Sequence, residues 1–347
     1  MATKSGKKGP RTIAWLSPGQ VDLVRAVRDA AGLQLVAVGC PEKGRTGGVA
    51  DELDAEPATD LRVALASGDA ELALLTSLTE FGGAGSQDAG AIEAARARGM
   101  TITTLEPIPG SALELGSGGW TRSQHGVRPI DGVQLVPRMR QSRAMALAAD
   151  ALDAFGRVRV LRFESLCRGE HASLGGRLLD AMDLAHAMMG MPETIDAAFV
   201  GPNAPGVHAA PGDTLRSLRG DLTINLRFAD GRAACAVLSD QAPRWDRSLV
   251  ALGDEGQLAI DEDSLAWTNP AGEVFDTQRV EPSASDRGIA PEVAAIVDAV
   301  MNLLESPSPP PPIDYEALLA MAQAALLSAR TGQGESPAMF RRMVVGA

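Results

Sequence analysis

Lysine is almost absent from this chain of 347 residues. It occurs only at Lys4, Lys7, Lys8 and Lys43. Beyond residue 43 the sequence therefore offers no lysine as a proton donor or as a Schiff-base nucleophile. Any reaction that depends on a lysine in the later part of the chain is excluded.

Cysteine and long apolar runs are also scarce. The three cysteines, Cys40, Cys167 and Cys235, are odd in number and far apart, which is unlike a disulfide framework and fits a reducing compartment. No CxxC or HxxxH spacing indicates a metal site. No apolar run is long enough for a signal peptide or a membrane span. We therefore expect a cytoplasmic protein with no membrane partner.

A basic surface is missing as well. The formal charge is −12 at pH 7 and the pI is near 4.9. Binding to nucleic acid requires positive charge that displaces counterions from phosphates, so we expect no nucleic-acid partner. The length predicts two domains, because one compact core rarely grows to this size.

Residues 10–140 alternate short apolar strands with helical segments. Apolar runs at 12–16, 33–38, 72–75 and 100–105 predict strands, and the spacing of apolar residues between them predicts helices. Buried strands separated by helices are typical of a parallel sheet that is covered on both faces. This part of the chain therefore predicts a Rossmann-like domain.

The chain changes character at residues 101–110, TITTLEPIPG. A strand cannot continue through Pro107 and Pro109, because proline lacks an N–H group and restricts the residue before it. Residues 110–132 are rich in glycine, serine and arginine and show no period, which predicts a long loop. We expect any site to lie near this turn.

Residues 141–347 predict a second, α/β domain with a large, mostly antiparallel open sheet. Helical patterns cover 142–155, 176–189, 293–304 and 315–330. Strand patterns follow one another at hairpin spacing between residues 222 and 276, and Asp230-Gly231 is a strong turn signal within them.

This layout resembles the glucose-fructose oxidoreductase and inositol dehydrogenase (Gfo/Idh/MocA) family, over nearly the whole chain. Residues 91–107 (AIEAARARGMTITTLEP) are similar to its helix, strand and Glu-Lys-Pro segment. Residues 175–190 (GGRLLDAMDLAHAMMG) are similar to its Asp-Leu-x-x-x-x-Leu-Gly helix, and 328–333 (SARTGQ) to its closing motif. The resemblance implies a divergent member, with NAD or NADP as cofactor if any, and a sugar-like ligand. It also implies a homo-oligomer through the C-terminal sheet, or a hetero-oligomer with an active relative.

The resemblance places Ser17, Gly19 and Asp22 at the glycine positions of the dinucleotide turn, and only Gly19 matches. A carboxylate at Asp22 would cap the first helix and repel a pyrophosphate. The ribose-binding acid is replaced by Cys40, whose thiol is a poor partner for a diol. Arg45 lies close behind and could meet a ribose or a 2′-phosphate, or could be a solvated charge in a turn.

The catalytic motifs differ from the family in the same way. Leu105 and Glu106 stand where the Glu-Lys-Pro segment has its glutamate and lysine. Glu106 could act as a general base if it is desolvated, or could simply close a strand. Gly176 and Asp180 stand at the family's catalytic Asp and His positions, and a shift of a few residues would bring His171 into the site.

Two sets of residues are candidates for a new substrate site. Trp120, Arg122 and His125 lie in the predicted loop and could stack on a sugar or hold an anion. Arg140, within the arginine-rich segment 138–143, could clamp a carboxylate or a phosphate. Surface-loop positions and ion pairs are the alternative interpretations.

Two hypotheses follow. The first is a protein of this family with degenerate dinucleotide and catalytic motifs and weak or absent dehydrogenase activity. The second is an active NAD(P)-dependent oxidoreductase on a sugar or cyclitol, with its chemistry rearranged around Glu106, Asp180 and His171. The residues favour the first, because the phosphate turn, the ribose acid, the lysine and the histidine are all lost together.

Overall fold

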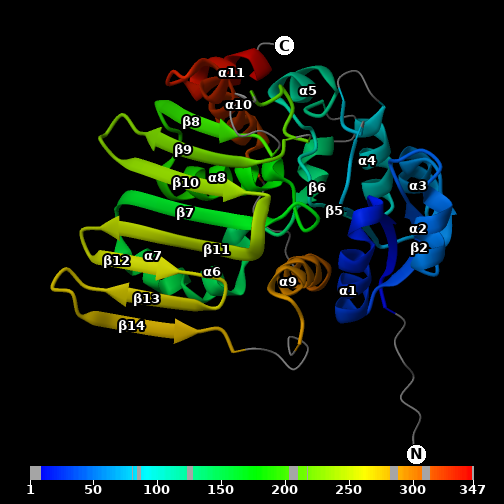
Figure 1. Cartoon of the computed structure of the whole chain (residues 1–347), viewed down its shortest axis with the longest axis horizontal. Coiled ribbons are helices and arrows are strands. Elements are labelled where there is room, and N and C mark those ends of the chain that lie inside the picture. Colours follow the sequence, from blue (N-terminus) through cyan, green and yellow to red (C-terminus); the bar gives the residue numbers. More distant parts are fainter. Residues whose placement is uncertain are drawn as a thin grey trace, which may run out of the picture.

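The computed structural model describes residues 9–345 except 80, 84–86, 123–127, 203–209, 217, 282–287 and 307–312. These residues form two sheets that stand next to each other, each with helices packed against it (Figure 1). The fold class expected from the sequence is confirmed.

The N-terminal sheet is parallel throughout, as predicted. Its strand order is β3-β2-β1-β4-β5-β6. The order reverses between β1 and β4, and α/β sheets of this kind bind ligands at the carboxyl ends of the strands at such a point. The strands are β1 (Arg11–Trp15), β2 (Gln34–Gly39), β3 (Glu56–Ala58), β4 (Leu72–Leu75), β5 (Thr101–Thr104) and β6 (Val133–Leu135).

The helices of this half pack on the sheet through apolar faces. In α1 (Val21–Ala31), Leu23, Val24 and Val27 are buried at helical spacing. The helix ends at Gly32, whose φ of 64° suits glycine. The other helices are α2 (Thr46–Glu52), α3 (Leu61–Ser67) and α4 (Asp88–Ala97).

The C-terminal sheet has the order β14-β13-β12-β11-β7-β10-β9-β8, and only the β7–β10 pair is parallel. This confirms the mostly antiparallel sheet. The strands are β7 (Val158–Arg168), β8 (Thr194–Val200), β9 (Asp221–Arg227), β10 (Ala233–Ser239), β11 (Gln241–Gly253), β12 (Gly256–Ile260), β13 (Ser264–Thr268) and β14 (Val274–Arg279).

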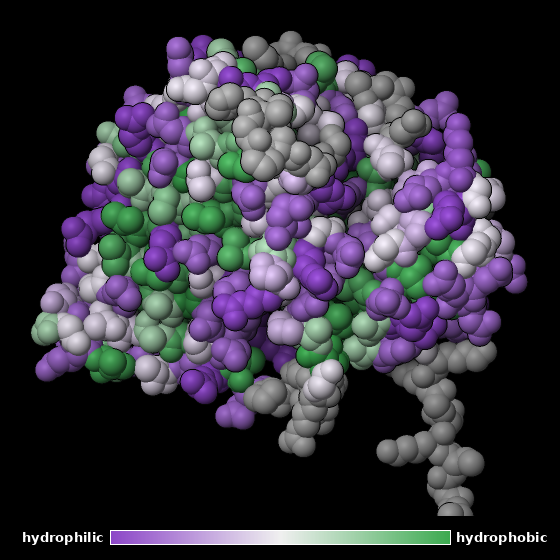
Figure 2. All heavy atoms as spheres, in the orientation of Figure 1, coloured by the Kyte–Doolittle hydropathy of each residue, from purple (hydrophilic) through white to green (hydrophobic). Residues whose placement is uncertain are grey.

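Helices cover one face of this sheet and leave the other open. α6 (Arg143–Leu147), α7 (Ala149–Phe155) and α8 (Leu174–Met189) lie behind the strands in Figure 1. On the open face Val160, Val237 and Leu252 are exposed, and Figure 2 shows apolar residues gathered over this region.

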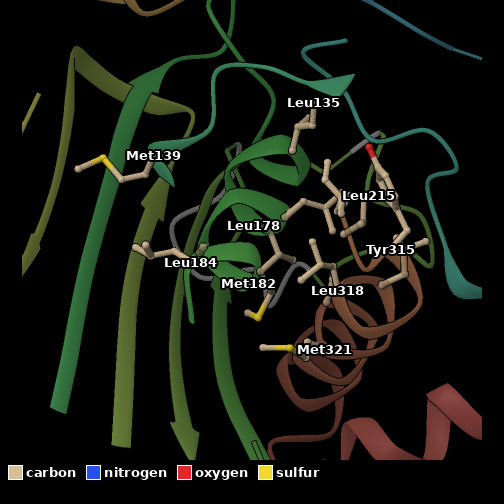
Figure 3. Close-up of a cluster of buried hydrophobic side chains, with 14 of the residues drawn as sticks. Leu135, Met139, Leu178, Met182, Leu184, Leu215, Tyr315, Leu318 and Met321 are labelled. Carbon is tan, nitrogen blue, oxygen red and sulfur yellow. The ribbon is translucent and has the colours of Figure 1, made fainter. Parts of the chain in front are cut away.

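The core behind the sheet joins α8 to α10 (Tyr315–Thr331). Leu178 and Met182 of α8 face Leu318 and Met321 of α10 (Figure 3). The Tyr315 hydroxyl donates a hydrogen bond to the carbonyl of Val133 at 3.0 Å. This bond ties α10 to β6, the last strand of the N-terminal sheet.

Three local predictions need correction. Residues 110–132 are not a continuous loop, because Ser111 caps a short helix, α5 (Ala112–Ser117). The single helix predicted over 142–155 is two helices that meet at Ala148. The sequence shows no clear pattern, and so predicts no element, at strand β8, at the first half of β11 and at the helix α11 (Pro337–Val345).

Helix α9 (Pro291–Glu305) crosses the expected domain boundary. It packs against α1, where Val293 and Ile296 meet Leu23 and Val27 in one apolar cluster. A helix from the C-terminal half thus completes the core of the N-terminal sheet. The division of the chain into domains 10–140 and 141–347 stays a prediction. The contact between α9 and α1 crosses this boundary.

Helix α8 approaches the turn after β5 very closely. A Cβ atom added at Gly176 would lie 2.5 Å from the carbonyl oxygen of Leu105. No side chain fits there unless the backbone moves. Helix α8 and the turn after β5 are therefore in direct contact at Gly176.

Truncating Ile296 should weaken the contact between α9 and α1. Ile296→Ala removes a side chain that is only 1% exposed and is expected to lower the free energy of unfolding by about 2–5 kcal/mol. Asn302→Ala, at an exposed position of the same helix, is the control and should change it by less than about 0.5 kcal/mol. Urea denaturation measures both. Equal effects would show that α9 does not stabilise the N-terminal sheet.

Two glycine-to-alanine changes should have opposite effects. Gly176→Ala places a methyl group against the Leu105 carbonyl and is expected to cost about 1–3 kcal/mol. Gly90 is exposed in α4 with open space around its Cβ position, so Gly90→Ala should stabilise the protein by about 0.5–1 kcal/mol. Thermal unfolding of the two variants tests the pair. A neutral Gly176→Ala variant would contradict the close approach of α8.

Candidate functional site

A polar cleft of about 520 Å³ lies where the two sheets meet. The loops after β1 and β4 supply Ser17, Gln20 and Ser77 to one wall. The other wall comes from the ends of the C-terminal strands, namely residues 168–170, Arg219 and residues 240–243. The cleft includes the switch point of the parallel sheet, where a ligand is expected in this architecture.

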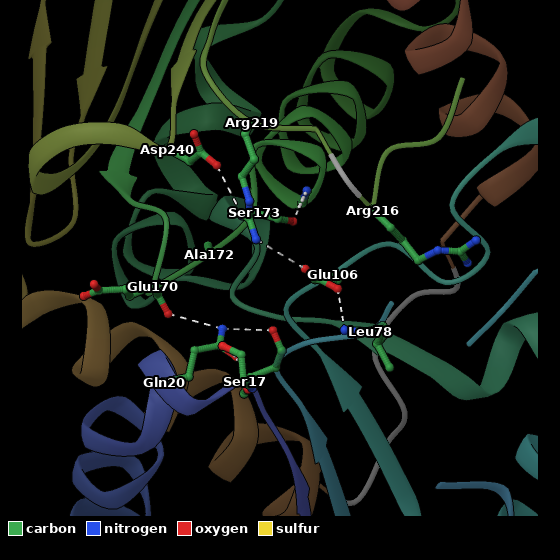
Figure 4. Close-up of polar contacts among 12 residues, drawn as sticks. Ser17, Gln20, Leu78, Glu106, Glu170, Ala172, Ser173, Arg216, Arg219 and Asp240 are labelled. Atoms are coloured by element: carbon green, nitrogen blue, oxygen red, sulfur yellow. Dashed lines mark hydrogen bonds and ion pairs between the residues drawn. The ribbon is translucent and has the colours of Figure 1, made fainter. Parts of the chain in front are cut away.

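The side chain of Gln20 spans this switch point (Figure 4). Its Oε1 accepts hydrogen bonds from the Ser17 amide at 3.1 Å and from Thr76 Oγ1 at 2.9 Å. Its Nε2 donates to the carbonyls of Thr76 at 3.0 Å and Glu170 at 3.3 Å. Gln20 is 6% exposed. One buried amide therefore joins the ends of β1 and β4 to the loop after β7.

The turn that carries Gln20 is a short 3-10 helix, Pro18–Gln20. Pro18 fixes its own φ and suits the first position of such a turn, and Gln20 follows at the start of α1. A Cβ atom at Gly19 would meet nothing within 4 Å. Ser17 lines the cleft, the space beside Gly19 is open, and a role of either residue in cofactor binding stays a prediction.

Asp22 does not cap the first helix, so that expectation is wrong. Its carboxylate forms an ion pair with Arg25 and is 94% exposed. The capping position of α1 is held by Gln20, and no side chain accepts a capping bond there. Asp22 lies inside the first turn rather than before it, so its carboxylate extends into solvent instead of folding back on the free N–H groups.

Cys40 directly follows β2 and lies in an apolar cluster, not in the cleft. It is buried with Val38, Val49 and Leu53, and its Sγ accepts a hydrogen bond from the Glu42 amide at 3.4 Å. Burial raises the pKa of this thiol. Arg45 is exposed at the start of α2. The thiol and the arginine are therefore not brought together with Ser17 in the cleft.

Glu106 is buried behind the wall of the cleft, is 4% exposed, and meets the cleft lining only through Arg219. Its Oε2 accepts a hydrogen bond from the Leu78 amide at 2.6 Å, and its Oε1 lies 3.9 Å from Arg219 Nη2 (Figure 4). Burial raises the pKa of Glu106 to about 7, and the Leu78 amide and Arg219 oppose this rise. The carboxyl group can thus gain or lose a proton near neutral pH.

Arg219 connects Glu106 to a second carboxylate. Its Nη1 lies 3.2 Å from Asp240 Oδ2. Asp240 also accepts hydrogen bonds from the Gly220 amide at 2.8 Å and from Gln241 Nε2 at 2.6 Å. Sequence reasoning did not find Arg219, Asp240 or Gln20. The only sequence signal was at Gln20, whose long amide side chain directly follows Gly19, the one glycine that matches the phosphate turn.

Asp180 is buried below the cleft and supports the fold. Its Oδ1 accepts a hydrogen bond from the Met139 amide at 2.7 Å, and its Oδ2 lies 3.6 Å from Arg247 Nη1. Burial raises the pKa of Asp180 to about 6. With Arg177 it borders a separate cavity of about 10 Å³, the size of one water molecule.

His171 faces α9, although the loop that carries it borders the cleft. Its Nδ1 lies 3.4 Å from Glu292 Oε1. Among the described residues, Gly169 and Glu170 line the cleft and His171 does not. The structure therefore does not bring together Glu106, Asp180 and His171, which were predicted to form one site.

The predicted substrate residues also separate. Trp120 is completely buried in the main core, so its ring has no face free for a sugar. Arg122 is exposed, and His125 lies outside the described residues. Arg140 bonds Asp183 Oδ1 at 2.9 Å while Arg138 bonds its Oδ2 at 3.0 Å. The arginine-rich segment thus forms an ion pair with α8, which is the alternative weighed from the sequence.

Two further properties follow from the described part of the chain. No group of three or more histidine, cysteine, aspartate or glutamate side chains in it is arranged to hold a metal ion. None of its helices has the length and hydropathy needed to cross a membrane.

Comparison with known proteins gives a clear result for structure only. Neither a protein-family model nor a curated protein sequence matches this chain. Solved structures do match, and three of them are typical.

The first is an oxidoreductase from Agrobacterium radiobacter in complex with NAD+, L-tartaric acid and magnesium. It has a TM-score of 0.62 and 16% identity, over 95% of this chain and 99% of the other. The second is levoglucosan dehydrogenase in complex with NADH and levoglucosan, with a TM-score of 0.61 and 14% identity over 94% and 99%.

The third is a myo-inositol dehydrogenase from Corynebacterium glutamicum, with a TM-score of 0.58 and 17% identity over 94% and 98% of the two chains. All three cover both sheets of this protein. The chain therefore has the fold of the Gfo/Idh/MocA oxidoreductases, as its resemblance in sequence implied.

Proposed function

We propose that this protein is a divergent Gfo/Idh/MocA-type oxidoreductase relative that binds a nicotinamide dinucleotide weakly or not at all. Classical dehydrogenase activity is then weak or absent. The observation that carries this proposal is the Gln20 amide across the switch point between β1 and β4.

A bound pyrophosphate needs free N–H groups at the turn after β1 and at the start of α1. Here the Ser17 amide already donates to Gln20. Admitting a dinucleotide would break the hydrogen bonds of Gln20, each worth about 0.5–1.5 kcal/mol. Cys40 stands where the resembling family has its ribose-binding acid, and its thiol is buried in an apolar cluster. The residues present therefore do not fit NAD or NADP.

The ligand that we propose for the cleft is a small, sugar-like molecule. The cleft is mostly polar and has the volume of a small-molecule site, and levoglucosan and L-tartaric acid are ligands of two structural neighbours. We further propose that the protein is cytoplasmic. It would form an oligomer through the open face of its C-terminal sheet, with itself or with an active relative.

A second candidate function is supported by Glu106. A carboxyl group with a pKa of about 7 beside an arginine is suited to accept a proton from a substrate hydroxyl. In that case the protein is an active NAD(P)-dependent oxidoreductase on a sugar or cyclitol, with Glu106 in place of the family's lysine. It would require Gln20 to leave the switch point.

Titration with NADH and NADPH separates the two candidates. Nucleotide fluorescence is expected to show no saturable binding to the wild-type protein up to millimolar concentration. Gln20→Ala removes the amide from the switch point and is expected to increase binding if Gln20 is the obstacle. Asn302→Ala, on the distant face of α9, is the control. Saturable binding to the wild-type protein would overturn the proposal and support the active oxidoreductase.

The proton affinity of Glu106 has its own test. Its pKa is about 7 when folded and 4.5 ordinarily. Between these values the folded state holds more protons than the unfolded state, so stability falls as pH rises. Glu106→Gln cannot ionise at this position, so it lacks this loss of stability. The free energy of unfolding of Glu106→Gln minus that of the wild type should therefore rise with pH by up to about 3 kcal/mol across this window and stay level above it.

Urea denaturation at a pH below and a pH above the window measures this difference. Glu170→Gln, at an exposed carboxyl group on the rim of the cleft, is the matched control and should show little change between the two conditions. If Glu106→Gln behaves like the control, Glu106 ionises in its ordinary range and loses its support as a base.

A further inference from the structure

Arg168 is a charged side chain in the cleft without a partner. It ends β7, is exposed, and lines the wall formed by the C-terminal sheet. None of the described residues forms an ion pair or a side-chain hydrogen bond with its guanidinium group. By contrast, Arg159 at the other end of the same strand pairs with Asp254 at 3.1 Å.

Arg219 adds a second guanidinium group to the same wall. It is 42% exposed, so part of it faces the open cleft. Asp240 is its near partner, but the Gly220 amide and Gln241 Nε2 also donate to that carboxylate. Asp240 therefore balances the charge of Arg219, while the exposed part of the guanidinium group keeps N–H donors open to the cleft.

Among the described residues, no carboxylate pairs with Arg168. Glu170 bonds Gln20 through its backbone carbonyl, and its carboxylate points away from Arg219 (Figure 4). Glu106 is buried 3.9 Å from Arg219 and is not part of the cleft lining. Arg168 thus offers its N–H donors to a negatively charged group of a ligand in the cleft.

The opposite wall has groups of a different kind. Ser17 and Ser77 line it and can exchange hydrogen bonds with hydroxyl groups. The volume of about 520 Å³ lies within the usual range for a small-molecule site. Arginine binds carboxylates through paired, parallel hydrogen bonds. A ligand that has hydroxyl groups at one end and a carboxylate at the other matches both walls.

We propose that the cleft binds a sugar acid, with its carboxylate held by Arg168 and Arg219 and its hydroxyl groups directed to Ser17 and Ser77. This proposal rests on the proposed function, which places a sugar-like ligand in the cleft. It adds that the ligand carries a negative charge. A neutral sugar would leave Arg168 unpaired. A dinucleotide phosphate would need the turn that Gln20 occupies, so a free carboxylate is the better match.

Glucuronate and glucose test the proposal, because they differ mainly in the carboxylate. Isothermal titration of the wild-type protein is expected to show saturable binding of glucuronate that weakens with added salt. Glucose should bind at least about tenfold more weakly, the effect of losing hydrogen bonds to a charged group. Inorganic phosphate is titrated in parallel. Phosphate binding equal to that of glucuronate would show an anion site without selection for a sugar acid and would overturn the proposal.

Arg168→Gln and Arg219→Gln should each weaken glucuronate binding at least about tenfold and leave glucose binding unchanged. Arg159→Gln, on the same strand but far from the cleft, is the matched control and should bind normally. Arg168 is exposed and unpaired, so its variant is expected to fold even if Arg219→Gln does not. Unchanged glucuronate binding by Arg168→Gln, or equal affinity for glucose and glucuronate, would overturn the proposal.

The same protein samples are titrated with NADH, which keeps the two proposals separate. Saturable NADH binding together with selective glucuronate binding would overturn the proposed loss of the cofactor and leave the sugar-acid site standing. If the protein binds no NADH and does not bind glucuronate selectively, the sugar-acid site would be overturned and the proposed loss of the cofactor would stand.

Discussion

The Gln20 amide is the contact on which the arrangement of the cleft depends. It is buried, and it bonds backbone groups at the ends of two neighbouring strands and in a loop of the other sheet. A buried amide leaves few of its hydrogen bonds unmade, because each loss costs free energy. The two halves of the chain are thus joined at the switch point of the parallel sheet, where α/β sheets of this kind bind ligands.

Glu106 is buried next to a close contact between α8 and the turn after β5. Gly176 has no side chain, so α8 can approach the carbonyl of Leu105, and an added Cβ atom would lie 2.5 Å from that oxygen. This contact directly precedes Glu106 in the chain. Glu106 is 4% exposed, and burial raises its pKa to about 7.

The sequence was sufficient to predict the class of both sheets and most of their strands, although not β8 or the first half of β11. The apolar runs at residues 12–16 and 72–75 become β1 and β4, and Asp230-Gly231 turns the chain between β9 and β10. These signals depend only on residues that are neighbours in the sequence, so they predict structure without knowledge of the packing. The position of α9 could not be predicted, because an apolar helix face does not identify the surface that it covers.

The site was harder to predict for the same reason. Gln20 stands in a turn, where a polar side chain usually extends into solvent, and only the folded chain brings Thr76 and Glu170 to it. Trp120 was misread because its glycine- and arginine-rich surroundings indicate a surface loop, whereas its ring fills the core. Arg168 shows no sequence signal at all, since the role proposed for it depends on its lack of a partner among the residues that the structure describes.

The packing of α9 on α1 has a consequence for how the protein is made. The ribosome releases the chain from its N-terminus, so the apolar face of Leu23 and Val27 emerges long before Val293 and Ile296 can cover it. Until most of the chain has been synthesised, the first sheet has an exposed apolar surface of the kind that chaperones bind. Completion of the N-terminal half is in this way delayed until the C-terminal sheet has already left the ribosome.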